Sequence, residues 1–217
     1  MFCLLGLRFL YTTNQQGNIH HSLFKPDQYA KLEHIQPLLA KAVVASEDYL
    51  FWKHFGIDWK QLFGVVEDNV EKLRFTRGAS TISQQLIKNY FFDTKKSVVR
   101  KIFEIILTLE MELITPKKII LEQYLNIIEF GPDVYGVHQA SFYYFKKTPH
   151  QLNLGESLFL ISLLPSPIKY GRGFHQRRLS RGTRNRMLKV GQRLVWAGQI
   201  SSGQKFGAVS AFFQRWQ

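Results

Sequence analysis

The stretch "VVRKIFEIILTLEMELI", residues 98–114, decides the fold class, because apolar side chains recur along it at helical spacing and cover nearly every side. A helix of this kind is predicted to lie buried in the protein. Glu104 stands near its middle, and a buried carboxylate is costly unless it is paired or used. Arg100, one turn earlier, is the expected ion-pair partner. A structural ion pair and a functional carboxylate are both open at this point.

The segments around this stretch have the same period. Helices are expected over residues 36–47, 59–73, 80–91, 116–129, 134–145 and 154–164. No strand alternation competes with these patterns, and no internal repeat or low-complexity tract interrupts them. The predicted fold class is therefore all-α.

The helix expected over residues 80–91 lies in "RGASTISQQLIKN", residues 77–89, and is amphipathic. Its apolar side holds Ile82, Leu86 and Ile87, and its polar side holds Thr81, Gln84, Gln85 and Lys88. This polar side is rich in hydrogen-bond donors and suits an anionic ligand. Gly78 and the free N–H groups near Ser80 would add to such a site. A capped surface helix is the structural alternative.

A second carboxylate candidate stands in "AVVASEDYLFWKHFGID", residues 42–58. Here an apolar helix ends in Glu47 and Asp48, although a helix C-terminus prefers cations. That cost indicates a function for the acids, with a solvated helix end as the alternative. His54 is expected to be a structural hydrogen-bonding residue rather than a catalyst.

Composition allows one domain, or two lobes of one, in 217 residues, and the single cysteine, Cys3, excludes an internal disulfide framework. Net charge is +13, yet residues 157–217 hold eleven Lys or Arg and no acid, so the rest nets only +2. Such a segment is drawn to nucleic acid or to an anionic bilayer surface. Within it, Arg177, Arg181 and Arg184 share a helical face.

The N-terminal run "MFCLLGLRFLY" is apolar but too short to cross a bilayer, which needs roughly 20 residues. We expect residues 1–20 to be the stub of a membrane anchor followed by a connector. Residues 21–217 are expected to form one domain that ends in the basic segment.

Two carboxylates, a donor-rich helix and isolated cations together describe a site for displacement at a sugar carbon. An inverting reaction needs a base on one side of the ring and stabilisation of the leaving group on the other. For a diphosphate leaving group, Lys and Arg replace the general acid of a glycosidase.

Six blocks carry a family resemblance: "ASEDYLFWKHFGID" from Ala45, "RGASTISQQLIKN" from Arg77, "RKIFEIILTLEME" from Arg100, "ILEQYLNIIEFG" from Ile120, "YGVHQASFYYF" from Tyr135 and "ESLFLISLLPSP" from Glu156. With these blocks in this order, the chain resembles the peptidoglycan glycosyltransferases of family 51, of the monofunctional biosynthetic transglycosylase type. The resemblance covers about residues 40–170.

The resemblance implies a lysozyme-like helical fold with a smaller, membrane-proximal jaw lobe, at the periplasmic face of the inner membrane. The implied reaction is inverting polymerisation of lipid II into glycan strands, with release of undecaprenyl diphosphate and without transpeptidase activity. Implied partners are lipid II, the growing strand, the anionic membrane surface and other cell-wall synthesis proteins, but no nucleic acid.

The resemblance also assigns residue roles. Glu47 matches the base that deprotonates the acceptor 4-hydroxyl, and Glu104 matches the second carboxylate near the donor diphosphate and any Mg²⁺ or Mn²⁺ there. Lys88 matches the lysine that contacts the diphosphate. The remaining implied substrate-binding residues are Ser80, Thr81, Gln84, Gln85, Lys96, Arg100 and Lys101.

The chain departs from the family pattern at one helix end, and two other functions are alternatives to the one that the resemblance implies. The family's "YFGK" is here "YFKK", so Lys146 replaces a glycine near a helix end. A lysozyme-like hydrolase of finished peptidoglycan is one alternative, but it does not explain the cation-and-glutamine helix. A nucleic-acid-binding module is the other, and its weakness is that most of the net charge lies in one segment.

Overall fold

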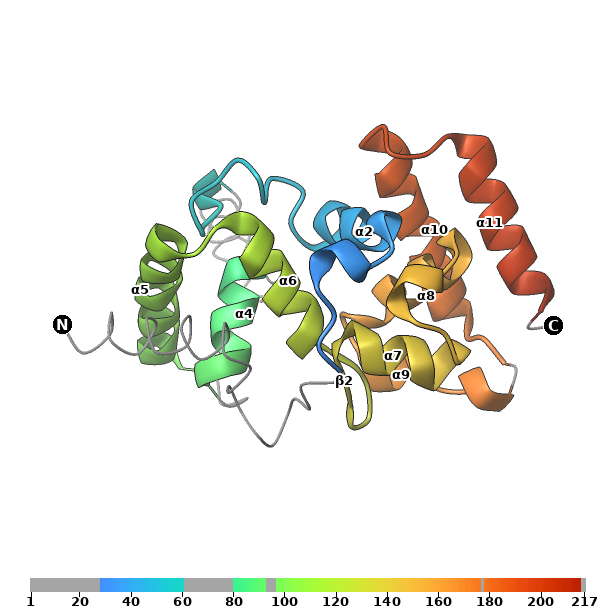
Figure 1. Ribbon diagram of the computed structural model, residues 1–217, viewed down its shortest axis with the longest axis horizontal. Coiled ribbons are helices and arrows are strands. Elements are labelled where there is room, and N and C mark those ends of the chain that lie inside the picture. Colours follow the sequence, from blue (N-terminus) through green and yellow to red (C-terminus); the bar gives the residue numbers. More distant parts are fainter. Residues whose placement is uncertain (1–27, 61–79, 93–96, 177, 216–217) are drawn as a thin grey trace, which may run out of the picture. The chain divides into compact units, whose positions relative to one another are not determined.

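The computed structural model describes residues 28–60, 80–92, 97–176 and 178–215, and these are mostly helical (Figure 1). Its α-helices are α2 (Pro37–Glu47), α4 (Ile82–Phe91), α5 (Val98–Ile114), α6 (Lys117–Ile127), α7 (Gly136–Phe145), α8 (Leu154–Leu163), α9 (Pro167–Gly171), α10 (Arg181–Trp196) and α11 (Ser202–Gln214). Short 3₁₀ helices are η2 (Leu32–His34), η3 (Pro149–Gln151) and η4 (Phe174–Gln176). The prediction of a helical fold is confirmed.

A small hairpin departs from the all-α prediction. Strands β1 (Glu129–Gly131) and β2 (Val134–Tyr135) pair antiparallel, and Asp133 turns the chain between them with φ of 58°. The sequence pattern over residues 134–145 predicted helix from its first residue, whereas α7 begins at Gly136. Strands this short show too few alternations to be recognised.

The chain divides into two compact units, which are described separately. Unit 1 contains residues 48–124, and unit 2 contains residues 22–47 and 125–217. The chain passes from unit 2 into unit 1 between Glu47 and Asp48.

Unit 1 is built on helices α4 and α5, which pack against each other. Side-chain caps start both: Thr81 Oγ1 accepts from the backbone N–H of Gln84, and Ser97 Oγ accepts from that of Arg100. Most of the helix expected over residues 59–73 lies outside the described residues.

The prediction that α5 is buried is wrong. Its buried residues are Glu104, Thr108, Met111 and Glu112, whereas Val98 and Leu113 are 78% and 69% exposed. Further apolar side chains that are at least one-third exposed on α5 are Val99, Ile102, Phe103, Ile106 and Ile114. The polar side of α5 faces α4, because its charged residues find hydrogen-bond partners there. Much of its apolar side is exposed.

Unit 2 is built around α8, whose residues from Gly155 to Leu163 are all buried. Helices α2, α10 and α11 pack against α8, and α10 also packs against α2 and α11 (Figure 1). An aromatic cluster fills the space beside α8, in which Phe159 contacts Tyr144, Phe145, Phe174 and Phe212.

Two backbone positions in unit 2 are specialised. Gly136 has φ of +76°, and a Cβ atom there would lie 2.4 Å from the carbonyl oxygen of Asn126, so only glycine fits. Lys146, the residue that replaces the family's glycine, ends α7 in the left-handed conformation with φ of 54°. A left-handed lysine costs about 1 kcal/mol relative to glycine.

Candidate functional site

The candidate substrate-binding residues lie in unit 1, and the candidate base lies in unit 2. Lys96, Arg77 and Gly78 lie outside the described residues. The other unit 1 candidates come from the start of α4, from its polar side and from the first half of α5. Glu47 ends α2.

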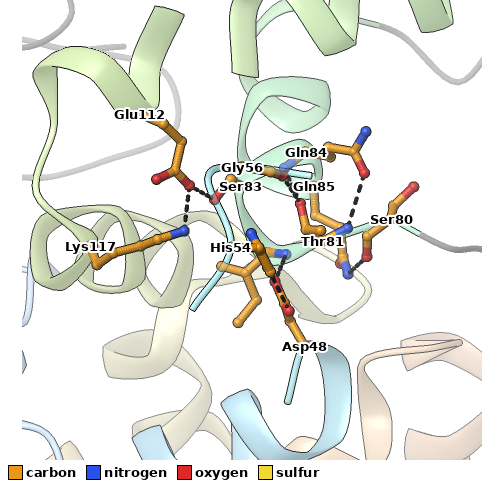
Figure 2. A network of polar contacts seen from close by, with 11 residues as sticks. Asp48, His54, Gly56, Ser80, Thr81, Ser83, Gln84, Gln85, Glu112 and Lys117 are labelled. Carbon is orange, nitrogen blue, oxygen red and sulfur yellow. Dashed lines mark hydrogen bonds and ion pairs between the residues drawn. The ribbon is translucent and has the colours of Figure 1, made fainter. Parts of the chain in front are cut away.

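Two of the predicted ligand-binding residues serve the fold of α4. Thr81 and Gln84 form a capping box, in which the Thr81 backbone N–H donates to Gln84 Oε1 at 3.1 Å (Figure 2). Thr81 Oγ1 also donates to the carbonyl of Gly56 at 2.6 Å. Both residues are buried. Gln84 Nε2 is buried and has no hydrogen-bond partner among the described residues.

Gln85 and Ser80 lie at the edge of this cap. Gln85 Nε2 donates to the carbonyl of Ser80 at 3.3 Å, and Gln85 Oε1 accepts from the hydroxyl of Tyr124 at 3.0 Å. The amide of Gln85 is thereby held between α6 and the residue that precedes the α4 cap, which orients Ser80.

A cluster of cations surrounds Glu104. Lys101 forms the ion pair with Glu104, and its Nζ also donates to Ser80 Oγ at 3.3 Å. The partner was expected to be Arg100; Lys101, three residues before Glu104, takes the role because i,i+3 positions also share a helix face. Glu104 is 2% exposed.

Lys88 of α4 interacts electrostatically with the same charged residues. Its pKa lies below the ordinary 10.5 because burial disfavours its charge; Glu104 opposes this effect, and Arg100 and Lys101 add to it. Lys88, Arg100 and Lys101 therefore act on one another near buried Glu104. Such a group of cations attracts an anionic ligand.

A second charged network was missed from the sequence. Glu112 Oε1 accepts from Ser83 Oγ and, at 2.7 Å, from Lys117 Nζ, which joins α5, α4 and α6 (Figure 2). The signal was available, because Glu104, Thr108 and Glu112 follow at intervals of four residues and so share one face of α5.

Asp48 forms a third connection. Its carboxylate accepts from the backbone N–H of Ile82, the first residue of α4, at 2.9 Å and contacts His54 Nε2 at 2.9 and 3.0 Å. Both side chains are more than nine-tenths buried. His54 thus makes the kind of hydrogen bond expected of a structural residue, and the pair fixes the start of α4.

Glu47 is half-buried at the end of α2 in unit 2. Ser46 Oγ donates to Glu47 Oε1 at 3.3 Å, and Arg193 of α10 donates to the carbonyl of Ser46. The carboxylate is thus supported by its neighbour and remains partly open to solvent, as a base must be.

Neither a metal cluster nor a membrane-spanning helix occurs in the described parts of the chain. They bring together no group of three His, Cys, Asp or Glu suited to a metal ion. None of their helices combines the length and apolar character needed to cross a bilayer.

Comparison with known proteins places these residues in a family. A family model described as Transglycosylase matches residues 16–192. Proteins called biosynthetic peptidoglycan transglycosylase are similar to the chain: that of Shewanella oneidensis is 42% identical over 76% of this chain and 73% of its own length.

The relatives from Pasteurella multocida and Mannheimia succiniciproducens are 41% and 45% identical, over 74% and 65% of this chain. The match spans 62% and 58% of their own lengths. The family match takes in the α4 cap, both buried carboxylates of α5 and the Asp48–His54 pair. The chain belongs to the transglycosylase family.

Proposed function

We propose that the protein polymerises lipid II into glycan strands, with inversion at the MurNAc anomeric carbon and release of undecaprenyl diphosphate. The observation that carries the proposal is the cation cluster of Lys88, Arg100 and Lys101 around buried Glu104. Cations in this position would stabilise the charge that develops on a departing diphosphate. Family membership supports the same reaction.

The proposed roles follow from where each side chain lies. Lys88 and Lys101 stabilise the departing diphosphate, together with Arg100. Glu104 holds Lys101 in place toward Ser80. Glu47 acts as the base that takes the proton of the acceptor 4-hydroxyl, since it is half-buried and not fully enclosed.

Gel analysis of products from labelled lipid II tests the proposal. The wild-type chain should give a ladder of uncrosslinked glycan, and Glu47→Gln should give only monomer with an unchanged melting temperature. A positioned base contributes roughly a hundredfold or more, so a Glu47→Gln enzyme with a tenth of wild-type turnover would exclude the base assignment. Degradation of finished peptidoglycan would instead indicate the hydrolase.

Attachment to the periplasmic face of the inner membrane is part of the proposal. Its support is the apolar side of α5, where Phe103 and Ile102 are about half exposed, because such a face is stabilised by contact with lipid. Unit 1 would then be the membrane-proximal jaw lobe of a lysozyme-like fold.

The basic segment is proposed to bind anionic headgroups. Arg181 and Arg184 lie in the first turns of α10, while Arg177 lies outside the described residues. Near an anionic surface each cation contributes about 1 kcal/mol. Vesicle sedimentation tests this, and equal binding to neutral and anionic vesicles would exclude the electrostatic contribution.

A divalent cation at the donor diphosphate, Mg²⁺ or Mn²⁺, is a separate proposal. The residues present fit such an ion only through Glu104, which supplies a carboxylate oxygen next to the cation cluster. The ion would take its other ligands from diphosphate oxygens and water, and would neutralise charge on the leaving group. Rates measured in EDTA and after adding each metal back test it.

A further inference from the structure

The end of α2 places a carboxylate where a helix favours a cation. Glu47 is the last residue of α2, and within α2 the last turn holds no basic residue. The final carbonyls of a helix have no partner inside it, and the helix dipole makes that end negative. Glu47 therefore needs a cation from elsewhere if it is to keep one orientation.

Arg193 of α10 supplies this cation within unit 2. Its guanidinium group donates to the carbonyl of Ser46 and lies 3.4 Å from Ser46 Oγ. Helix α10 packs on α2, and the next residue, Leu194, is fully buried. The position of Arg193 is thus set by the packing of α10.

Ser46 connects Arg193 to the proposed base. Its hydroxyl lies within reach of the guanidinium group and donates to Glu47 Oε1 at 3.3 Å. On the other side of Glu47, the carboxylate of Asp48 is fixed by His54 and by the backbone of Ile82. Ser46, before Glu47, is therefore held by contacts within unit 2, and Asp48, after it, is held by contacts within unit 1.

We propose that Arg193 is a positioning residue that orients Glu47 through Ser46 for proton abstraction. The inference rests on the proposed function of Glu47 as the base. It goes beyond the family match, which ends at residue 192. Arg193 contacts the backbone carbonyl and the hydroxyl of Ser46, so its loss should affect turnover more than binding.

The test uses the full-length chain in detergent micelles without anionic lipid, with kcat and KM for lipid II measured on four variants. Arg193→Ala should lower kcat about tenfold or more and leave KM within about twofold, because small misplacements of a reacting group are costly. Arg193→Lys should recover part of the loss, and added guanidinium ion should raise the rate of Arg193→Ala but not of wild type. Lys189→Ala, which removes an exposed cation one turn earlier on α10, should behave as wild type.

Glu47→Gln is measured in parallel, together with the melting temperature of every variant. If Arg193→Ala keeps kcat within about twofold while Glu47→Gln is inactive, the inference on Arg193 fails and the proposed function stands. A kcat loss that follows a lowered melting temperature and ignores guanidinium would make Arg193 a structural contact only, and overturn the inference. Turnover retained by Glu47→Gln would overturn the base assignment and this inference together.

Discussion

Helices α5 and α8 both have strongly apolar sequences, and they use their apolar side chains in opposite ways. From Gly155 to Leu163, α8 is buried on every side. On α5 the interior holds Glu104, Thr108 and Glu112, while most of the apolar residues face outward. A strongly apolar sequence thus predicts a helix, but it does not predict which side of that helix packs against the rest of the protein.

Their buried carboxylates differ in the same way. Glu156 of α8 belongs to a capping box in the first turn and pairs with Lys147, so its charge meets a favourable helix end. Glu104 stands in the middle of α5, where no helix end helps it, among cations from two helices. The carboxylate of α8 stabilises a helix start, whereas that of α5 is the one that we propose to act in ligand binding.

The largest effect is expected from removing a ring of the α8 core. Phe159→Ala should lower the free energy of unfolding by about 3–5 kcal/mol, because the cavity left among four other rings cannot close fully. Phe103→Ala on the open side of α5 should change it by about 0.5 kcal/mol or less. Denaturant unfolding of both variants measures the contrast, and equal losses would mean that α5 is packed like α8.

A second prediction sharpens the comparison within α5. Glu104→Gln should lower turnover about a hundredfold or more, because Lys101 loses the charge that directs it toward Ser80. Stability should also fall, by about 1–3 kcal/mol, because the buried side chain at position 104 loses its ion pair with Lys101. Lipid II assays and melting curves give the two quantities.

Glu112→Gln is the matched control for that prediction. Glu112 is buried on the same face and, like Glu104, pairs with one lysine, but it also accepts from Ser83 and joins three helices. The Glu112→Gln variant should be less stable than the wild type and should keep most of its turnover. Equal loss of activity in both variants would assign Glu104 to structure alone.

The third prediction concerns the open side of α5. Replacing both Ile102 and Phe103 by Ser should weaken binding to lipid vesicles about tenfold, because roughly one buried side chain's transfer free energy is lost. Unfolding free energy should stay nearly constant. Phe142→Ser, which removes a similarly exposed ring from α7, is the control that should bind as wild type. Vesicle sedimentation measures the binding of both variants. If the double variant binds vesicles as wild type does, α5 does not contact the membrane.

The sequence predicted the helical fold because caps and helical periodicity are local properties. Ser97 caps α5, which has the predicted bounds, whereas α4 begins at Ile82, two residues after the expected start. Which side of α5 is buried depends on α4, since Ser83 donates its hydroxyl to Glu112 and Ser80 accepts from Lys101, the lysine paired with Glu104. The four-residue spacing of Glu104, Thr108 and Glu112 marks the polar face of α5, but it does not show which residues of α4 meet that face. The spacing also could not tell Lys101 from Arg100 as the partner of Glu104, because i,i+3 and i,i+4 positions both share a helix face.

The smallest predicted effect is a pH dependence that arises from Lys88. Burial and the neighbouring cations hold its folded-state pKa below 10.5, so between that lowered pKa and 10.5 the unfolded chain binds more protons than the folded one. Stability should therefore rise with pH across this window, while lipid II binding should weaken as the charged form of Lys88 is lost. Unfolding free energies and KM measured from about pH 7 to about pH 10 should show these opposite trends in wild type. Both trends should be reduced in Lys88→Met and retained in Lys118→Met, a variant at an exposed lysine of α6. If stability instead fell through the window as much in Lys88→Met as in wild type, other groups would control the alkaline behaviour.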